Sequence, residues 1–277
     1  MLSPALGASP RRRSARTLLY LPAYNAAQTL ERTLAGVTPG EVDEVLLVDD
    51  GSHDETLSVA RRLGLHVIAH ATNQGYGASQ KTAYRAALRA GFDQVVMLHP
   101  DMQHDARLLP YLLGPVREGI YDIMLGSRIR TWAEALAGGM PLYKYVSNRV
   151  LTGVQNVATG QNFSEWHTGF RAYHRRVLEA VPFEQNSDDF AFDSEILLQA
   201  VTFGFRVGEI PVPVWYGPGS SSIRPAAAVR YGLATLAALG SCLLHRCGVH
   251  HHPRWRPVAP GTWGSDRPAT EERFQKS

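Results

Sequence analysis

Short apolar runs alternate with amphipathic stretches along the first half of the chain. Residues 18–22, 45–49, 65–69 and 95–98 are apolar and no longer than a strand, and the Val- and Leu-rich runs suit strands buried on both faces. Residues 27–37, 55–63 and 78–90, between these runs, have apolar positions at helical spacing and end at or near a glycine. This alternation predicts a mostly parallel sheet with crossover helices.

The second half continues the alternation less regularly. Residues 122–125 predict another strand, and residues 107–117, 143–158, 175–180 and 193–203 predict helices. Residues 207–215 read as an extended stretch, and Pro211 and Pro213 place it at a sheet edge because proline cannot donate to a ladder. With no internal repeat or linker, residues 17–225 are expected to form one α/β domain.

The two ends of the chain have a different composition. Residues 1–16 are rich in arginine and lack the apolar stretch of a signal peptide, so we expect a disordered basic arm and no export. Residues 226–249 are apolar but interrupted by basic side chains, which favours a helix that packs on the domain or lies at a membrane surface over one that spans it. Residues 250–277, rich in Pro, Gly and charge, are expected to be a disordered tail.

The overall composition narrows the class of protein. The chain has 277 residues, of which 44% are hydrophobic and 19% are charged, as in an ordinary globular protein. The net charge of +3 is small and much of the positive excess lies in the first 16 residues, which argues against a nucleic-acid partner. Cys242 and Cys247 have neither metal-site nor disulfide spacing, so a cytoplasmic location is expected.

Polar residues follow two of the predicted strands directly. Asp49 and Asp50 end the run at 45–49 and are followed by a glycine, while His99, Asp101 and Gln103 follow the run at 95–98. Carboxylates at the first position commonly bind a ribose or base, and alternate residues of the second set project to one side, where they suit a cation that bridges a diphosphate. Plain turns and helix caps remain the alternative for each set alone.

A glycine-containing loop at residues 73–77 begins the predicted helix through residue 90. Free backbone N–H groups at such a helix start favour an anion, and Lys81, one turn later, is within reach of a diphosphate. The loop has neither the spacing of a Walker motif nor that of a dinucleotide fingerprint. On these grounds Asn73, Gly75 and Lys81 are candidate nucleotide-binding residues.

As an ordered set, the motifs resemble those of family 2 glycosyltransferases with a GT-A fold, in the branch of dolichol-phosphate mannose synthases and bacterial polyprenyl-phosphate glycosyltransferases. The resemblance covers residues 18–222 and implies a Rossmann-like, mostly parallel sheet with flanking helices. The matching motifs are PAYN at 22–25, VDDGS at 48–52, NQGYG at 73–77, HPDMQ at 99–103, GSR at 126–128 and HTGFRAY at 167–173.

The resemblance also implies roles for individual residues. The residues expected to bind the nucleotide are Pro22, Tyr24, Asn25 and Asp49, together with Asp50 beside it. Asp101 and Gln103 are expected to hold a divalent cation, Mn²⁺ or Mg²⁺, and Arg128 is expected to approach the donor sugar or phosphates. The residues expected to face the acceptor are His167, Thr168, Gly169 and Arg171, of which Arg171 suits a phosphate because its fork can bind two oxygens.

One residue departs from the family pattern, and the catalytic base is left undecided by it. His99 stands where the family motif usually has its first Asp, and an imidazole ligand suits Mn²⁺ better than Mg²⁺. The stretch at residues 188–195 holds several carboxylates, of which Asp193 is the candidate base, although helix capping explains it equally well. A phosphate acceptor needs no base, because it is already an anion near neutral pH.

The resulting prediction is an inverting glycosyltransferase that moves a hexose or N-acetylhexosamine from a nucleotide diphosphate sugar, with UDP favoured over GDP, to a polyprenyl phosphate. A hydroxyl of a soluble specialised metabolite is the alternative acceptor. A non-catalytic nucleotide-sugar binding protein is the competing class. A sugar nucleotidyltransferase is disfavoured because PAYNAAQ stands where its Gly-rich basic loop belongs. Peripheral contact with the inner face of the membrane is expected, and the sequence indicates no oligomeric state.

Overall fold

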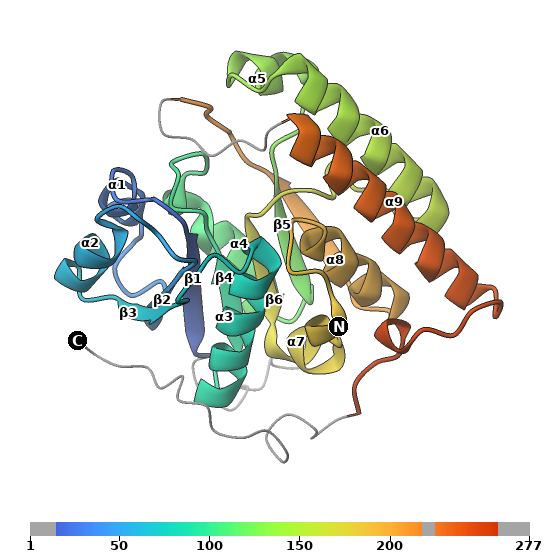
Figure 1. Ribbon diagram of the computed structural model, residues 1–277, viewed down its shortest axis with the longest axis horizontal. Helices are drawn as coiled ribbons and strands as arrows, with labels where there is room; N and C mark the ends of the chain where they lie inside the picture. Colours follow the sequence, from blue (N-terminus) through green and yellow to red (C-terminus); the bar gives the residue numbers. More distant parts are fainter. Residues whose placement is uncertain (1–14, 218–224, 260–277) are drawn as a thin grey trace, which may run out of the picture.

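A seven-stranded sheet forms the centre of the protein, in the order β3-β2-β1-β4-β6-β5-β7 (Figure 1). The computed structural model describes residues 15–217 and 225–259. All neighbouring strands are parallel except β6, which is antiparallel to β4 and β5, so the predicted mostly parallel sheet is confirmed. The strands are β1 (Thr17–Ala23), β2 (Glu44–Asp49), β3 (His66–Ala69), β4 (Gln94–Met97), β5 (Ile123–Ser127), β6 (Arg171–His174) and β7 (Val207–Pro211).

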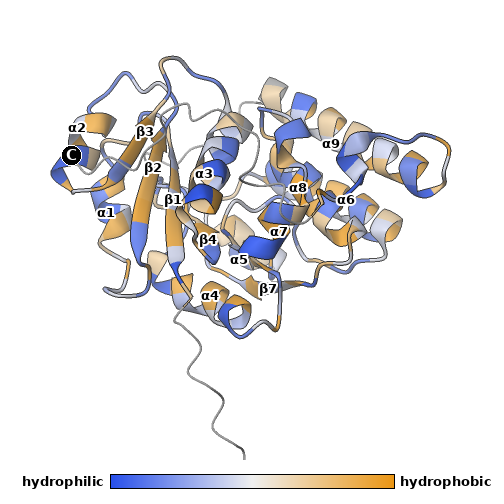
Figure 2. Ribbon diagram, turned by 90° about the horizontal axis from the view of Figure 1, so that it is seen from below, coloured by the Kyte–Doolittle hydropathy of each residue, from blue (hydrophilic) through white to orange (hydrophobic). Residues whose placement is uncertain are grey.

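Helices cover both faces of the sheet because alternate strand residues point to opposite faces. Leu18 and Tyr20 of β1 pack in one core with α3, α7 and α8, whereas Leu19 and Leu21 pack in a second core with α1, α2 and α4. Figure 2 shows the hydrophobic residues concentrated along the strands between these layers. The helices are α1 (Leu30–Leu34), α2 (Thr56–Arg62), α3 (Tyr76–Ala90), α4 (Leu109–Arg117), α5 (Trp132–Ala137), α6 (Leu142–Thr159), α7 (Arg175–Ala180), α8 (Phe192–Thr202) and α9 (Pro225–Arg246), with short 3₁₀ turns η1 (Ala106–Leu108), η2 (Phe183–Gln185) and η3 (Pro253–Trp255).

The sheet directions bring the predicted motifs to one edge. β1, β2 and β4 are parallel, and β5 runs in the same direction because β6 is antiparallel to both β4 and β5. The carboxyl ends of these four strands therefore lie at the same edge of the sheet, which is where open α/β folds bind ligands. Because β6 runs in the opposite direction, it begins at the edge where these four strands end, and residues 167–169, which precede β6, lie near that edge.

Both predicted disordered ends are partly ordered, which corrects the sequence interpretation. Arg16 lies over the ring of Phe92 at 4.4 Å from its centroid and pairs with Glu44. In the tail, Trp255 is 2% exposed and its Nε1 donates to Ser241 of α9. A single anchoring residue in a polar stretch, Arg16 or Trp255, gives no periodic signal, so composition alone did not predict these contacts. Residues 1–14 and 260–277 lie outside the described residues.

Two long helices, α6 and α9, lie side by side away from the main body of the sheet (Figure 1). Their ends lie within a few residues of the predicted ranges 143–158 and 226–249. Arg246 near the end of α9 donates to the backbone oxygen of Ala158 near the end of α6, and α9 also packs on α8. Residues 207–215 form strand only as far as Pro211, at the sheet edge as predicted, and Val214 makes an isolated bridge to His104.

Candidate active site

The end of β2 offers a buried carboxylate oxygen to a ligand. Asp49 is 1% exposed, and its Oδ2 accepts a hydrogen bond from the backbone of Ser52 at 3.0 Å. Its Oδ1 is buried and has no partner among the residues that the structure describes. Because a buried acceptor without a partner is costly, this atom fits the predicted contact with a base or ribose.

The end of β1 is tied to the same turn. The backbone N–H of Asn25, which has a φ of 53°, donates to Ser52 Oγ, and Asn25 Oδ1 accepts from the backbone of His53 at 2.9 Å. Tyr24 is 51% exposed and lies edge-on to the His53 ring. Pro22 is half-buried and Asn73 is exposed, and the nucleotide contacts of both residues stay predictions.

Asp50 has a structural role that the sequence did not indicate. Its carboxylate accepts hydrogen bonds from the backbone N–H groups of Gln74 and Gly75 at 2.8 and 2.9 Å, and it pairs with His70 at 2.7 Å. The backbone N–H groups of Gly77 and Ala78 donate to the carbonyl of Asp188. The N–H groups of Gln74, Gly75, Gly77 and Ala78 are thus used within the protein and are not free for an anion as predicted.

The same loop explains the position of Lys81. A Cβ on Gly75 would lie 2.3 Å from the Asp188 carbonyl oxygen, so the glycine allows the 186–189 segment to pack against the loop. Lys81 Nζ then donates to Asn186 O at 2.5 Å and to Asp188 Oδ1 at 2.7 Å, and its side chain is 10% exposed. The predicted reach of Lys81 to a diphosphate does not fit an ammonium held in this way.

The end of β4 brings Asp101, Gln103 and His99 to one cavity of about 820 Å³, as predicted. Asp101 is 8% exposed and its Oδ1 accepts from the backbone N–H of Gln103 at 3.0 Å. Met102 between them has a φ of 63°, which turns the chain sharply at this point. A carboxylate and an amide oxygen therefore face the same space.

A chain of hydrogen bonds fixes the ring of His99. Tyr76 Oη donates to Asp193 Oδ2 at 3.0 Å and lies 3.1 Å from His99 Nε2. Because the hydroxyl has one proton and gives it to the carboxylate, His99 Nε2 must carry a proton and donate to Tyr76. His99 Nδ1 then keeps the lone pair, and burial lowers the pKa of the ring despite the charge of Asp101, so the imidazole is neutral.

Gly169 makes room for this arrangement. A Cβ at residue 169 would lie 2.3 Å from His99 Nε2 and 3.2 Å from Tyr76 Oη. Asp193 is further held by Gln80 Nε2, which donates to its Oδ1 at 2.9 Å. Since both oxygens of Asp193 accept hydrogen bonds, the structure makes it a positioning residue for Tyr76 as much as a candidate base.

Arg128 is held by a fully buried partner that the sequence analysis missed. Glu165 accepts hydrogen bonds from the Arg128 guanidinium, from its backbone N–H and from Asn148 Nδ2. Burial alone raises the pKa of Glu165, but the charge and hydrogen bonds of Arg128 lower it to about 2. Glu165 lies two residues before the HTGFRAY motif, between Ser164 and Trp166, and no local pattern distinguishes it from a surface glutamate.

Arg171 is not placed to bind an acceptor phosphate, which corrects the prediction from the motif. Its side chain is 0% exposed, and its guanidinium donates to the backbone oxygens of Thr168, Asp193 and Trp166 at 2.5, 2.7 and 2.8 Å. Thr168 is also fully buried and donates to the carbonyl of Gly126. A buried arginine must use its donors internally, so Arg171 shapes the segment that carries Gly169.

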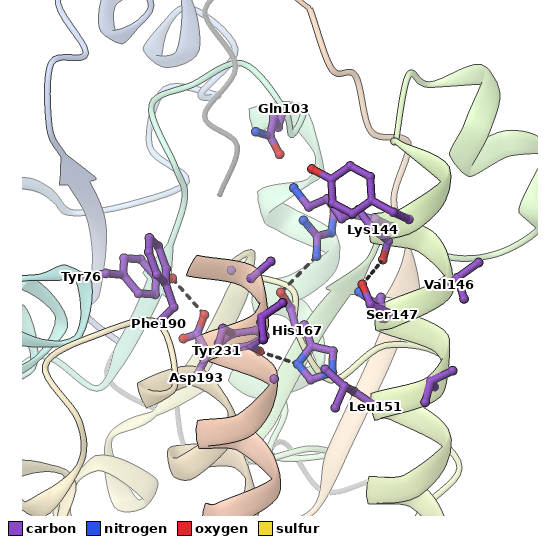
Figure 3. A pocket seen from close by; sticks show the side chains of 18 of the residues that line it. Tyr76, Gln103, Lys144, Val146, Ser147, Leu151, His167, Phe190, Asp193 and Tyr231 are labelled. Carbon is purple, nitrogen blue, oxygen red and sulfur yellow. Dashed lines mark hydrogen bonds between the residues drawn. The ribbon is translucent and has the colours of Figure 1, made fainter. Parts of the chain in front are cut away.

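His167 connects the strand edge to helix α9 (Figure 3). Its Nδ1 lies 2.5 Å from Tyr231 Oη of α9, and its Nε2 is buried without a partner among the described residues. Burial lowers the pKa of His167 to about 3, so the ring is neutral. Its place in the cavity wall fits the predicted position near an acceptor, and the acceptor contact itself stays a prediction.

The cavity continues from the strand ends into a groove between α6 and α9. Lys144 of α6 lies in the cavity wall between the strand-end residues and the groove, and its ammonium is 4.7 Å from the centre of the Tyr216 ring. Burial and the nearby Arg128 charge lower the pKa of Lys144 to about 8. The sequence analysis missed this cation because a single Lys in an amphipathic helix looks like a surface residue. The groove is lined by apolar side chains, namely Val146, Val150, Leu151, Val229, Leu233 and Leu236.

At the strand-end part of the cavity, the side chains include the types of metal ligand that a divalent cation needs, but too few of them to complete its coordination. In the described part of the chain, no three His, Cys, Asp or Glu side chains are grouped so that they could hold a metal ion. Asp101, Gln103 and the neutral His99 offer one carboxylate, one amide and one imidazole. Such a partial set fits Mg²⁺ or Mn²⁺, which are commonly bound by one or two carboxylates plus substrate phosphates.

The fold and the strand-end cavity define the chain as a glycosyltransferase with a GT-A fold. It belongs to glycosyl transferase family 2, whose family model matches residues 19–181. Over 217 residues the chain is 31% identical to glycosyltransferase AglD of Haloferax volcanii, covering 74% of this chain and 34% of that longer protein. It is 28% identical over 227 residues to a dolichyl-phosphate hexose transferase of the same organism, covering 81% of this chain and 90% of the relative.

A solved structure supports the fold. The glucosyl-3-phosphoglycerate synthase of Mycobacterium tuberculosis, in complex with Mn²⁺, uridine diphosphate and phosphoglyceric acid, superposes with a TM-score of 0.61 at 18% identity, over 86% of this chain and 80% of that one. At this identity the likeness establishes the fold. The predicted class of protein, its family and its fold are thus confirmed.

Proposed function

We propose that the protein transfers a hexose or N-acetylhexosamine from a nucleotide diphosphate sugar to a polyprenyl phosphate at the cytoplasmic face of the membrane, with inversion at the anomeric carbon. The observation that carries the proposal is the single cavity of about 820 Å³, which joins Asp101 and Arg128 at one end to an apolar groove at the other. A polyprenyl phosphate has the same two parts, an anionic head and an apolar chain. The relative named as a dolichyl-phosphate hexose transferase supports this acceptor.

The surroundings of Asp193 favour a phosphate over a hydroxyl acceptor. A hydroxyl needs a base to take its proton, and both oxygens of Asp193 are already engaged by Tyr76 and Gln80. A phosphate oxygen attacks without a base. Lys144 suits this head group, because its ammonium lies in the cavity wall between the strand ends and the apolar groove. A soluble metabolite hydroxyl remains the alternative acceptor, and a groove of apolar side chains gives it little to bind.

In the reaction, an oxygen of the acceptor phosphate forms a bond to the anomeric carbon while the bond from that carbon to the donor diphosphate breaks. The electron pair of the broken bond leaves with the diphosphate, and the product keeps the opposite anomeric configuration. Arg128, held by Glu165, contributes a fixed positive charge in the cavity wall where this negative charge develops. Asp49 Oδ1 is the free acceptor for the nucleotide.

A divalent cation fits the donor set of Asp101, Gln103 and His99. When bound, it would neutralise charge on the leaving diphosphate. His99 Nδ1 is the nitrogen left free by the bond to Tyr76, so this ligand set favours Mn²⁺ over Mg²⁺. The Mn²⁺ and uridine diphosphate named in the neighbouring structure support both the cation and a UDP sugar as donor.

The test is transfer from radiolabelled nucleotide sugars to a short-chain polyprenyl phosphate dispersed in detergent, with Mn²⁺ present. We expect a labelled lipid-phosphate sugar, and we expect Asp101→Asn to lower turnover by about a hundredfold, the order found when one charge-stabilising group is lost. Transfer to a water-soluble hydroxyl acceptor in place of the lipid phosphate would establish the alternative. Binding of nucleotide sugar without any transfer would instead support a non-catalytic binding protein.

Lys144 provides a second, narrower test. Lys144→Met should raise the KM for the acceptor phosphate and leave the KM for the donor unchanged, because the lysine lies at the junction with the groove. Arg149→Met is the matched control, since Arg149 is on the same helix but donates to Ser164 O and lies outside the cavity wall. Equal acceptor KM values for the two variants would exclude a phosphate contact by Lys144.

A further inference from the structure

Helices α6 and α9 share an exposed apolar surface that the fold leaves uncovered. On α6, Val146, Val150 and Val157 are 50%, 60% and 88% exposed, and on α9, Val229 and Leu233 are 65% and 64% exposed. Side chains of both helices line one groove, so the two apolar rows face a common side. Contiguous exposed apolar surface of this kind marks an interaction site in a folded protein.

The inner faces of the same helices are packed against the domain. Ala238, Leu239 and Cys242 of α9 are buried in the core with α8, and Thr152 and Gln155 of α6 are buried as well. In the described residues, α9 is a helix long and apolar enough to cross a membrane by length and composition, and 22% of that stretch is buried. Its attachment to the domain and the polar bonds at its end favour a helix that lies at an interface over one that spans.

The charged residues of these two helices are all basic, which indicates an anionic partner. Helices α6 and α9 together contain four basic residues, Lys144, Arg149, Arg230 and Arg246, and no Asp or Glu. The net charge of the whole chain is +3, so the remaining residues together are net negative. An apolar surface within two acid-free, basic stretches complements an anionic lipid bilayer, which attracts basic side chains at its surface and takes up apolar ones.

We propose that the α6 and α9 surface docks the protein on an anionic membrane as a peripheral, two-helix contact. The groove between the helices opens along this surface, so a lipid acceptor would enter from the bilayer without first being exposed to water. The docking itself needs neither donor nor acceptor. The link to a lipid acceptor rests on the proposed function, but the surface is tested independently of it.

The test is flotation of the full chain with unilamellar vesicles of phosphatidylglycerol or phosphatidylcholine, at low and high salt, without nucleotide sugar or polyprenyl phosphate. We expect binding to the anionic vesicles that falls at high salt. Arg230→Gln should weaken binding about fivefold, the loss expected for one basic residue near such a surface. Equal binding to both lipids at all salt concentrations would overturn the electrostatic part of the proposal.

Apolar contact is tested away from the groove, so that the site is not altered. Leu244 of α9 is 48% exposed and belongs to the same helix as Val229 and Leu233. Val157→Asp and Leu244→Asp should each weaken vesicle binding at least tenfold, because each puts a carboxylate on an exposed apolar position of the two helices. Ile120→Asp is the matched control, since Ile120 is 54% exposed but follows α4, on the other side of the sheet. Circular dichroism melts of all three variants establish that they are folded.

Two results would refute the membrane as partner. If the wild-type chain does not float with anionic vesicles, the proposal is wrong. If sedimentation shows a dimer that Val157→Asp dissociates, while vesicle binding is absent, the surface is an interface between copies. Failure of transfer in detergent with normal vesicle binding would refute the proposed function alone, because the vesicle experiment contains no substrate.

Discussion

The buried pair formed by Arg128 and Glu165 should contribute measurably to the stability of the protein. Glu165 is 0% exposed and accepts hydrogen bonds from Arg128 and Asn148. Its pKa falls from 4.5 to about 2 in the native protein, which corresponds to about 3 kcal/mol of native-state stability near neutral pH. Glu165→Gln should therefore lower the free energy of unfolding by about 3 kcal/mol, since it leaves a buried guanidinium without its counter-charge.

The assay is equilibrium unfolding in urea at pH 7, followed by tryptophan fluorescence and circular dichroism. For a chain of this size, a loss of about 3 kcal/mol lowers the Tm by about 6–12 °C. Glu134→Gln is the matched control, because Glu134 pairs with Arg130 on the surface of α5, where both side chains are about half exposed or more. An exposed pair of this kind contributes less than about 1 kcal/mol.

The pH dependence gives a second readout of the same pair. Because the pKa of Glu165 is lower in the native state than in the unfolded chain, its contribution is present above about pH 4.5 and is lost as the pH falls toward about 2. The wild-type protein should lose this part of its stability across that window, and Glu165→Gln should not. If the two Gln variants unfold at the same urea concentration, the assignment of Glu165 as the buried partner of Arg128 is refuted.

Three further substitutions test the rest of the site. Gly169→Ala should weaken Mn²⁺ binding, measured by electron paramagnetic resonance, because its Cβ would collide with His99 Nε2, whereas Gly153→Ala, which meets no atom within 4 Å, should not. His99→Asp should shift the cation preference of the reaction from Mn²⁺ toward Mg²⁺, and full activity of the wild type in excess chelator would contradict a cation role for His99. Arg171→Lys should destabilise the fold by about 3 kcal/mol, because one ammonium cannot reach the three backbone oxygens that the guanidinium serves in the core. An unchanged Tm with a raised acceptor KM would instead support a direct contact between Arg171 and the acceptor phosphate.

The sequence alone determined the fold class, the strand ends and several side chains at the strand-end part of the cavity, namely His99, Asp101, Gln103 and Arg128. The apolar runs at 18–22, 45–49 and 95–98 predict a buried parallel sheet, because burial on both faces requires such runs. Since parallel strands finish at one edge, Asp49, Asp101 and Gln103 could be grouped without coordinates, and the structure brings Asp101 and Gln103 to one cavity. Asp49 does not line that cavity, and its contact with the nucleotide stays a prediction that rests on a buried Oδ1 without a partner among the described residues.

Only the tertiary structure decided which of the charged residues face the cavity and which are used within the protein. Lys81 meets Asp188, 107 residues away, and Arg128 meets Glu165, 37 residues away. Arg171 lies in a motif that resembles an acceptor site, yet its donors are used by backbone oxygens in the core. Local patterns report burial and periodicity, which neighbouring residues share. The partner that satisfies a buried charge is chosen by distant segments, and only their packing brings the two together.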